Sequence, residues 1–184
     1  MKLSSFYDGD RTVLSFEVFP PKKTSSVETV YNTIAELQSL KPDYISVTYG
    51  AGGSAANNYT CDIASLIKNK YGIESMAHLT CINSTKADVD RVLKELKENN
   101  IENILALRGD KNPDFEPKTD FIHANDLVSY IKAQGDFGIS VAGYPETHFE
   151  APDGMTDITN LKNKVEFFFD TPVQSVTVVD GGYE

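Results

Sequence analysis

The sequence predicts an α/β protein of the (β/α)8 TIM-barrel type that is incomplete, with about five to six βα units. Short apolar runs alternate with longer amphipathic stretches along the chain. The first four runs begin roughly 30 residues apart, which is the usual size of a βα unit. The chain has 184 residues, whereas a closed barrel of eight units needs about 250.

Five nearly continuous apolar runs are expected to form parallel strands, because strands buried on both faces lack polar alternation. They cover residues 12–19, 44–49, 75–82, 103–107 and 139–144. The three phenylalanines of residues 167–169 could begin a sixth strand. A parallel sheet with intervening helices is therefore expected.

Amphipathic helices are expected between these strands. The first has apolar residues at spacings of three and four over residues 27–37, and Ser25 with Glu28 fits a capping box at its start. Thr85 and Asp88 fit a second capping box. Further helices are expected around residues 63–67, 127–131 and 158–165.

A barrel is favoured over a doubly wound sheet, because no Gly-x-Gly-x-x-Gly turn follows an early strand. The glycines of residues 50–53 have a different spacing and lack the Lys-Ser/Thr of a P-loop, so they form either a plain turn or a backbone surface for a phosphate. Residues 1–184 are treated as a single partial domain, with residues 171–184 as an atypical tail.

Seventeen basic and 27 acidic side chains give a net charge of −10. Such a surface repels nucleic acid and anionic membranes, although a few local cations could still bind a phosphate-bearing cofactor. No apolar run is long enough to span a bilayer. Cys61 and Cys81 are isolated thiols that are expected to fill the core, and a cytoplasmic location is expected.

Polar side chains lie at the carboxyl ends of five successive expected strands, where barrels carry their active sites. These residues are Glu17, Thr48, His78, Arg108, Asp110, Tyr144, Glu146 and His148. Their positions alone predict an active site at this rim.

Several of these residues have alternative interpretations. Glu17 lies in an apolar strand, where burial would favour the protonated form that a general acid requires, or it lies at a strand edge and faces water. Arg108 and Asp110 could simply pair with each other. Glu146 and His148 could be metal ligands, but no clear third ligand accompanies them, so no metal site is expected.

Five segments together resemble the methylenetetrahydrofolate reductase family, in family order and at family spacing. They are FEVFPPK at 16–22, SVTYGA at 46–51, HLTC at 78–81, ALRGD at 106–110 and AGYPETH at 142–148. The resemblance covers about residues 6–165.

The resemblance implies FAD-dependent reduction of 5,10-methylenetetrahydrofolate to 5-methyltetrahydrofolate with NADH or NADPH as hydride donor. Glu17 matches the general acid that helps to open the folate imidazolidine ring. Asp110 matches the carboxylate between flavin and folate. The positions that match FAD contacts are Thr48, His78, Arg108, Gly109, Asp110, Ala124, Tyr144, His148, Asp157 and Lys164. The positions that match the folate site are Glu17, Thr48, Asp110 and Glu166.

The chain departs from the family pattern at several positions. His123 stands where the family has Tyr, and Glu166 stands where it has a pterin-binding Gln. Several residues are missing after Val165, residues 171–184 do not resemble the family, and nothing corresponds to strands seven and eight. An open barrel exposes strand edges, which favours association, including a homo-oligomer.

The sequence is also compatible with two other functions. The chain could be a truncated, inactive remnant of such a reductase or a fragment that needs a partner. It could also be another flavin barrel, such as a proline dehydrogenase relative, but the segments around Glu17 and around residues 108–110 argue against that class.

Overall fold

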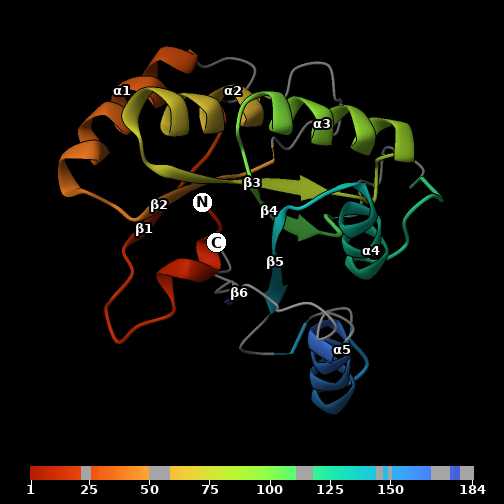
Figure 1. Cartoon of the computed structure of the whole chain (residues 1–184). Helices are drawn as coiled ribbons and strands as arrows, with labels where there is room; N and C mark the ends of the chain where they lie inside the picture. The colour runs from red at the N-terminus through yellow and green to blue at the C-terminus, as the bar shows by residue number, and fades with distance from the viewer. Residues whose placement is uncertain are drawn as a thin grey trace.

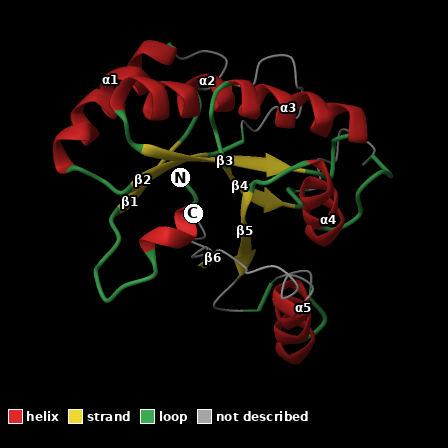
Figure 2. Ribbon diagram, in the orientation of Figure 1, coloured by secondary structure: helices red, strands yellow, loops and turns green. Residues whose placement is uncertain are grey.

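The structure is a computed structural model. It describes residues 1–21, 26–49, 59–110, 118–143, 147–148, 151–166 and 175–178, with only the backbone of residues 164–166 and 175–178. Strands and helices alternate along the described chain, as the sequence predicts (Figure 2).

Six parallel strands form one sheet in the order β1-β2-β3-β4-β5-β6. The strands are β1 (Ser15–Val18), β2 (Tyr44–Val47), β3 (Glu74–Thr80), β4 (Asn103–Leu107), β5 (Gly138–Gly143) and β6 (Ser175–Val178). Each strand pairs with its neighbour in sequence. This order has no reversal of the kind that defines a doubly wound sheet, so the fold is of the barrel type.

In the described part of the chain, five α-helices connect the strands. They are α1 (Val27–Leu37), α2 (Tyr59–Ser65), α3 (Lys86–Glu98), α4 (Ala124–Gln134) and α5 (Gly154–Glu166). Short turns of helix lie at Leu3–Phe6 and Gln38–Leu40, and a π-helical turn at Leu66–Lys70 continues α2. Helices α1 to α4 cover the outer face of the curved sheet (Figure 1).

The two faces of the sheet carry separate apolar clusters. The larger cluster joins the helices to the outer face and includes the fully buried Ile34, Ile45 and Ile104. The smaller cluster lies on the inner face, where Leu3 packs with Tyr44, Met76 and Leu105. Side chains alternate between the faces along each strand, which places Glu17, Ser46 and His78 toward the carboxyl ends of their strands on the inner face.

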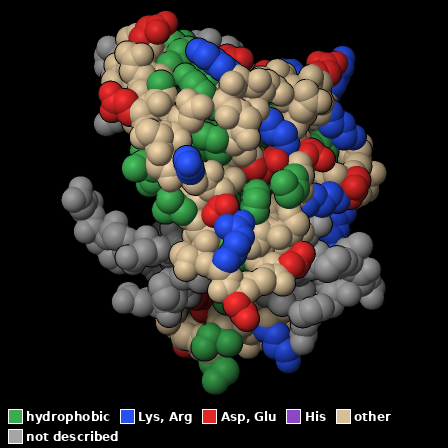
Figure 3. Space-filling model, turned by 60° about the vertical axis from the view of Figure 1, so that its left-hand side comes forward, with side chains coloured by type: hydrophobic (Ala, Val, Ile, Leu, Met, Phe, Trp, Pro, Cys, Tyr) green, Lys and Arg blue, Asp and Glu red, His purple; other side chains and the backbone are tan. Residues whose placement is uncertain are grey.

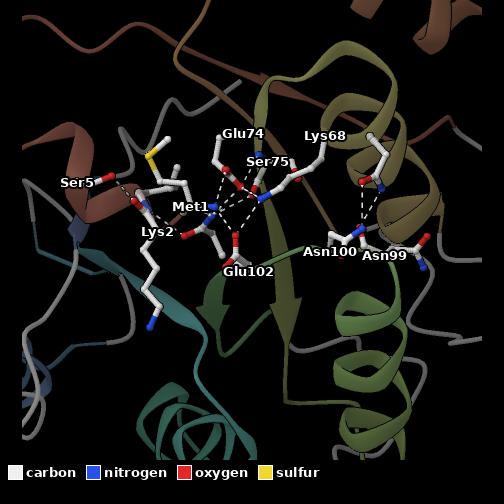
Figure 4. Close-up of polar contacts among 12 residues, drawn as sticks. Met1, Lys2, Ser5, Lys68, Glu74, Ser75, Asn99, Asn100 and Glu102 are labelled. Atoms are coloured by element: carbon white, nitrogen blue, oxygen red, sulfur yellow. Dashed lines mark hydrogen bonds and ion pairs between the residues drawn. The ribbon is translucent and has the colours of Figure 1, made fainter.

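The amino-terminal end of the sheet is closed by polar contacts around Glu74, whose side chain is only 7% exposed (Figure 4). The ammonium of Lys68 lies 2.5 Å from Glu74 Oε1, and the amide of Asn103 donates to the same oxygen at 3.2 Å. The N-terminal amine of Met1 donates to Glu74 Oε2 at 3.0 Å. Asn103 Oδ1 accepts the N–H of Leu3, which fixes this first segment across the inner face.

Two details of the helix starts can be compared with the sequence. The capping box of Thr85 and Asp88 is confirmed, with N–H groups and side chains bonded reciprocally. The prediction that Ser25 caps the first helix was wrong by one residue. The N-cap is Ser26, whose hydroxyl accepts the N–H of Glu28 at 3.2 Å.

A sixth strand lies near the described end of the chain. The sixth strand is Ser175–Val178, within the segment treated as an atypical tail. Residues 167–170, where a sixth strand was expected to begin, lie outside the described residues.

Lysine and arginine side chains are interspersed with acidic side chains over the face in Figure 3. Among the described helices, none has both the length and the apolar composition that crossing a membrane requires.

Candidate active site

Three polar side chains meet on the inner face, near the carboxyl ends of β1, β2 and β3. Ser46 is the register partner of Glu17 across the β1–β2 pair. The Ser46 hydroxyl donates to Glu17 Oε2 at 3.3 Å. His78 Nε2 lies 3.4 Å from the same carboxylate oxygen. One oxygen of Glu17 therefore faces side chains from both β2 and β3.

His78 is the most deeply buried ionisable group of this cluster, with a side chain 7% exposed. Burial lowers the pKa of His78 to about 4, because imidazolium loses its hydration in the interior of the sheet. The ring is therefore neutral near pH 7. Its Nε2 atom makes no hydrogen bond to the described residues, although Glu17 Oε2 lies close by. A buried nitrogen of this kind can serve a bound molecule.

Glu17 has a side chain that is 47% exposed. Of the two interpretations of the sequence, the structure supports a carboxylate open to solvent rather than one enclosed by apolar neighbours. The alternation of β1 explains this, because Val18 turns to the helix-covered face while Glu17 turns to the inner face. The carboxylate is accessible to a molecule at the rim.

The segment after β4 is bound to the segment after β3 through its backbone. The carbonyl of Arg108 accepts N–H groups from Cys81 at 3.2 Å and Ile82 at 2.8 Å. The Arg108 side chain turns back, and its Nε donates to the carbonyl of Gly109 at 3.1 Å. Gly109 has a φ of +83°, a left-handed conformation that suits glycine. Asp110, which follows directly, is exposed.

Two further predicted residues lie at element ends on the same rim. Thr48 follows β2, with its N–H bound to the carbonyl of Val18 at 3.0 Å and its own carbonyl bound to the hydroxyl of Thr60 at 2.8 Å. Ala124 is the buried first residue of α4. The preceding His123 is the N-cap residue, and its N–H donates to Asp126 at 2.9 Å.

His148 and Asp157 are also brought together. The backbone N–H of His148 donates to Asp157 Oδ2 at 3.1 Å, so the carboxylate at the start of α5 holds the segment that carries the histidine. Tyr144 lies outside the described residues. Lys164 and Glu166 belong to α5, but their side chains lie outside the described part of the structure.

Ser46 and Thr80 are residues at this site that sequence reasoning did not select. Ser46 is 5% exposed and bonds Glu17. It lies two residues before Thr48 on one strand, so the two-residue period of a strand could have identified it. Thr80 contacts Gly109 across the sheet, and no pattern in the sequence indicates that contact.

The parallel sheet, its outer helices and the polar rim at the strand ends define a barrel protein with a binding site at the carboxyl ends of its strands. The chain belongs to the methylenetetrahydrofolate reductase family, whose model matches residues 2–170. The matched region contains every predicted site residue.

Curated relatives are similar over most of the chain. The 5,10-methylenetetrahydrofolate reductase of Pectobacterium carotovorum is 43% identical over 169 residues, which is 87% of this chain and 56% of that protein. The Escherichia coli protein of the same name is 42% identical, covering 85% of this chain and 55% of its own length. Methylenetetrahydrofolate reductase (NADH) 1 of Arabidopsis thaliana is 37% identical, over 94% of this chain and 33% of that protein. The chain thus spans about half the length of the bacterial relatives.

Solved structures support the fold alone. A dihydrodipicolinate synthase variant matches with a TM-score of 0.53 and 12% identity, over 90% of this chain and 52% of that one. The 7,8-dihydropteroate synthase of Vibrio fischeri matches with a TM-score of 0.52 and 14% identity, over 95% of this chain and 63% of that one. With family membership, these matches confirm the predicted TIM-barrel class.

Proposed function

We propose that this chain binds FAD and reduces 5,10-methylenetetrahydrofolate to 5-methyltetrahydrofolate with NADH or NADPH as hydride donor. The observation that carries the proposal is the cluster of Glu17, Ser46 and His78 beside the Arg108–Asp110 segment, within a chain of the reductase family. The name of the Arabidopsis relative specifies NADH. That name supports NADH use by this chain.

The described residues fit a flavin. His78 offers a buried nitrogen without a hydrogen bond, suited to a polar atom of a bound molecule. The missing Cβ of Gly109 lets the segment after β4 pack against Thr80, which sets the backbone path at the rim, and Arg108 adds a positive charge to an acidic protein. We further assign cofactor contacts to Thr48, Asp110, Ala124, Tyr144, His148, Asp157 and Lys164. Bound FAD would accept hydride from the nicotinamide and pass it to the folate.

Glu17 supplies the proton in this proposal. Its carboxyl group is exposed and therefore accessible to a folate nitrogen at the rim, and protonation of that nitrogen would open the five-membered ring. Asp110 is exposed at the end of the β4 segment, where its negative charge would stabilise the cation that ring opening produces. Thr48 and Glu166 would complete the contacts to the folate.

The experiment is a titration of the purified chain with FAD, followed by two assays. A bound-flavin spectrum, oxidation of NADH or NADPH with a quinone acceptor, and reduction of methylenetetrahydrofolate are expected. Glu17→Gln is expected to keep the spectrum and the quinone reaction and to lose folate reduction. Lack of flavin binding after full titration would contradict the proposal.

An alternative is an inactive remnant or a fragment that needs a partner. Its motivating observation is that the chain covers 55% of the Escherichia coli relative. Flavin binding without folate reduction would support this alternative. Adding a polypeptide that carries the remaining part of the Escherichia coli relative distinguishes an inactive remnant from a fragment that needs a partner. Only the fragment would regain folate reduction.

We also propose that the chain is cytoplasmic and that it associates through an edge of its sheet. Cys61 and Cys81 are free thiols, which supports a cytoplasmic location. In the described sheet, β1 and β6 each pair on one side only, which supports association through an edge. Light scattering at several protein concentrations measures the association.

A further inference from the structure

We propose that Ser46 is a positioning residue for Glu17. Its hydroxyl holds one carboxylate oxygen, so that the other oxygen carries the proton toward the rim. The inference rests on the proposed function, because it assigns Ser46 a part in the proton transfer that Glu17 performs there.

The first observation is that Glu17 is held through a single oxygen. The Ser46 hydroxyl donates to Oε2 at 3.3 Å, and His78 Nε2 faces the same oxygen at 3.4 Å. Among the described residues, no hydrogen bond is made to Oε1. The two oxygens of one carboxyl group therefore have different surroundings, and an oxygen that accepts a hydrogen bond is the weaker site for a proton.

The second observation is that the donor is rigid and the acceptor is not enclosed. Ser46 is 5% exposed and lies in the middle of β2, paired with β1 on one side and β3 on the other. The Glu17 side chain is 47% exposed, with three rotatable bonds and little packing around it. Among the described residues, the fixed hydroxyl is thus the hydrogen-bond donor that orients the carboxyl group.

The third observation concerns His78, which does not replace Ser46. Burial lowers the pKa of His78 to about 4, so near pH 7 its ring carries no charge to attract the carboxylate. Nε2 also makes no hydrogen bond to Glu17, despite the 3.4 Å separation. Of the two neighbours of Oε2, only Ser46 donates a hydrogen bond to it.

The test compares Ser46→Ala with Ser46→Thr and with the control Ser75→Ala. Ser75 is a fully buried serine on the neighbouring strand β3, and its hydroxyl has no hydrogen-bond partner among the described residues. In the loaded enzyme, Ser46→Ala is expected to lower kcat for folate reduction on the order of tenfold. KM and the rate of the NAD(P)H–quinone reaction stay unchanged. Ser46→Thr restores kcat, and Ser75→Ala has no effect.

A second measurement needs no flavin and no turnover. In protein labelled with ¹³C-glutamate, the carboxyl resonance of Glu17 is the one that Glu17→Gln removes. Ser46→Ala is expected to shift and broaden it, because the carboxyl group then samples several orientations, and Ser46→Thr restores it. Ser46→Cys keeps the side-chain volume with a weak donor and is expected to act like Ser46→Ala, which covers the case of an unfolded alanine variant.

The outcomes separate the two proposals. An unchanged Glu17 resonance in folded Ser46→Ala or Ser46→Cys overturns the positioning role, whatever the activity. A changed resonance in a chain that never reduces folate supports the contact and counts against the proposed function alone. Equal losses in the quinone and folate reactions would assign Ser46 a general structural role and would also overturn the inference.

Discussion

Gly109 lies directly against Thr80: a Cβ atom built on Gly109 would be 3.0 Å from the Cβ of Thr80. This approach brings the end of β4 against the end of β3, where the carbonyl of Arg108 accepts the N–H of Ile82 at 2.8 Å. Gly109 also has a φ of +83°. A single glycine therefore sets the backbone path on which Arg108 and Asp110 depend.

We expect Gly109→Ala to lower the free energy of unfolding by about 2–5 kcal/mol. The left-handed backbone contributes about 1–2 kcal/mol and the contact with Thr80 the rest, because a Cβ atom cannot rotate away. Urea denaturation followed by circular dichroism measures the loss.

Gly72→Ala is the matched control for this change. Gly72 has a similar φ of +68°, but an added Cβ atom would meet nothing within 4 Å. Its expected cost is about 1–2 kcal/mol, from the backbone alone. Equal losses for the two variants would show that the contact with Thr80 contributes nothing.

The buried, neutral imidazole of His78 predicts a stability that depends on pH. Its pKa is about 4 in the folded chain and 6.5 in the unfolded chain. Above pH 6.5 both states carry a neutral ring, so His78 contributes no pH dependence. As the pH falls from 6.5 to 4, only the unfolded state gains the proton. The free energy of unfolding therefore falls, by about 3 kcal/mol over the whole window.

His78→Gln removes this contribution while the carboxyl groups titrate as before. As the pH falls from 7 to 4.5, the wild type should lose more unfolding free energy than His78→Gln does. Urea denaturation midpoints at several pH values give this difference. Parallel profiles for the two proteins would contradict the burial of a neutral ring.

The two thiols are expected to be inert in the folded chain. Burial raises the pKa of Cys61 to about 12 and that of Cys81 to about 11, and both side chains are almost fully buried. The reactive thiolate is therefore scarce and inaccessible at pH 8. A disulfide reagent such as DTNB should label neither thiol in the native protein and both in urea. Rapid labelling of either thiol without denaturant would refute this prediction.

The positions of the strands and the apolar stripes of the helices could be predicted because they depend on local periodicity. The run around Ile45 gave β2, and the stripe containing Ile34 gave α1. The exposure of Glu17 could not be predicted, since its apolar sequence neighbours Phe16 and Val18 turn to the other face. Whether the inner face at Glu17 is covered depends on the strands that surround it, and sequence spacing does not contain that information.

The family motifs selected individual residues of the candidate site. The contacts between those residues could not be predicted. His78 was selected, but its burial and its distance to Glu17 depend on the register of three strands. The N-cap differed by one residue because Ser25 and Ser26 are chemically identical and adjacent.

The ion pair at the opposite end of the sheet gives the last prediction. Glu74 is 7% exposed and Lys68 is 18% exposed, with 2.5 Å between Nζ and Oε1. Burial alone would lower the pKa of Lys68, but hydrogen bonds to Glu74 and Glu102 raise it overall. Lys68→Met leaves a buried carboxylate with fewer partners and should lower the free energy of unfolding by about 2–4 kcal/mol. In a Glu74→Gln background the same change should cost less, because no buried charge remains there. The double-mutant cycle from urea denaturation yields the coupling, and a coupling near zero would mean that Lys68 acts through packing of its alkyl chain.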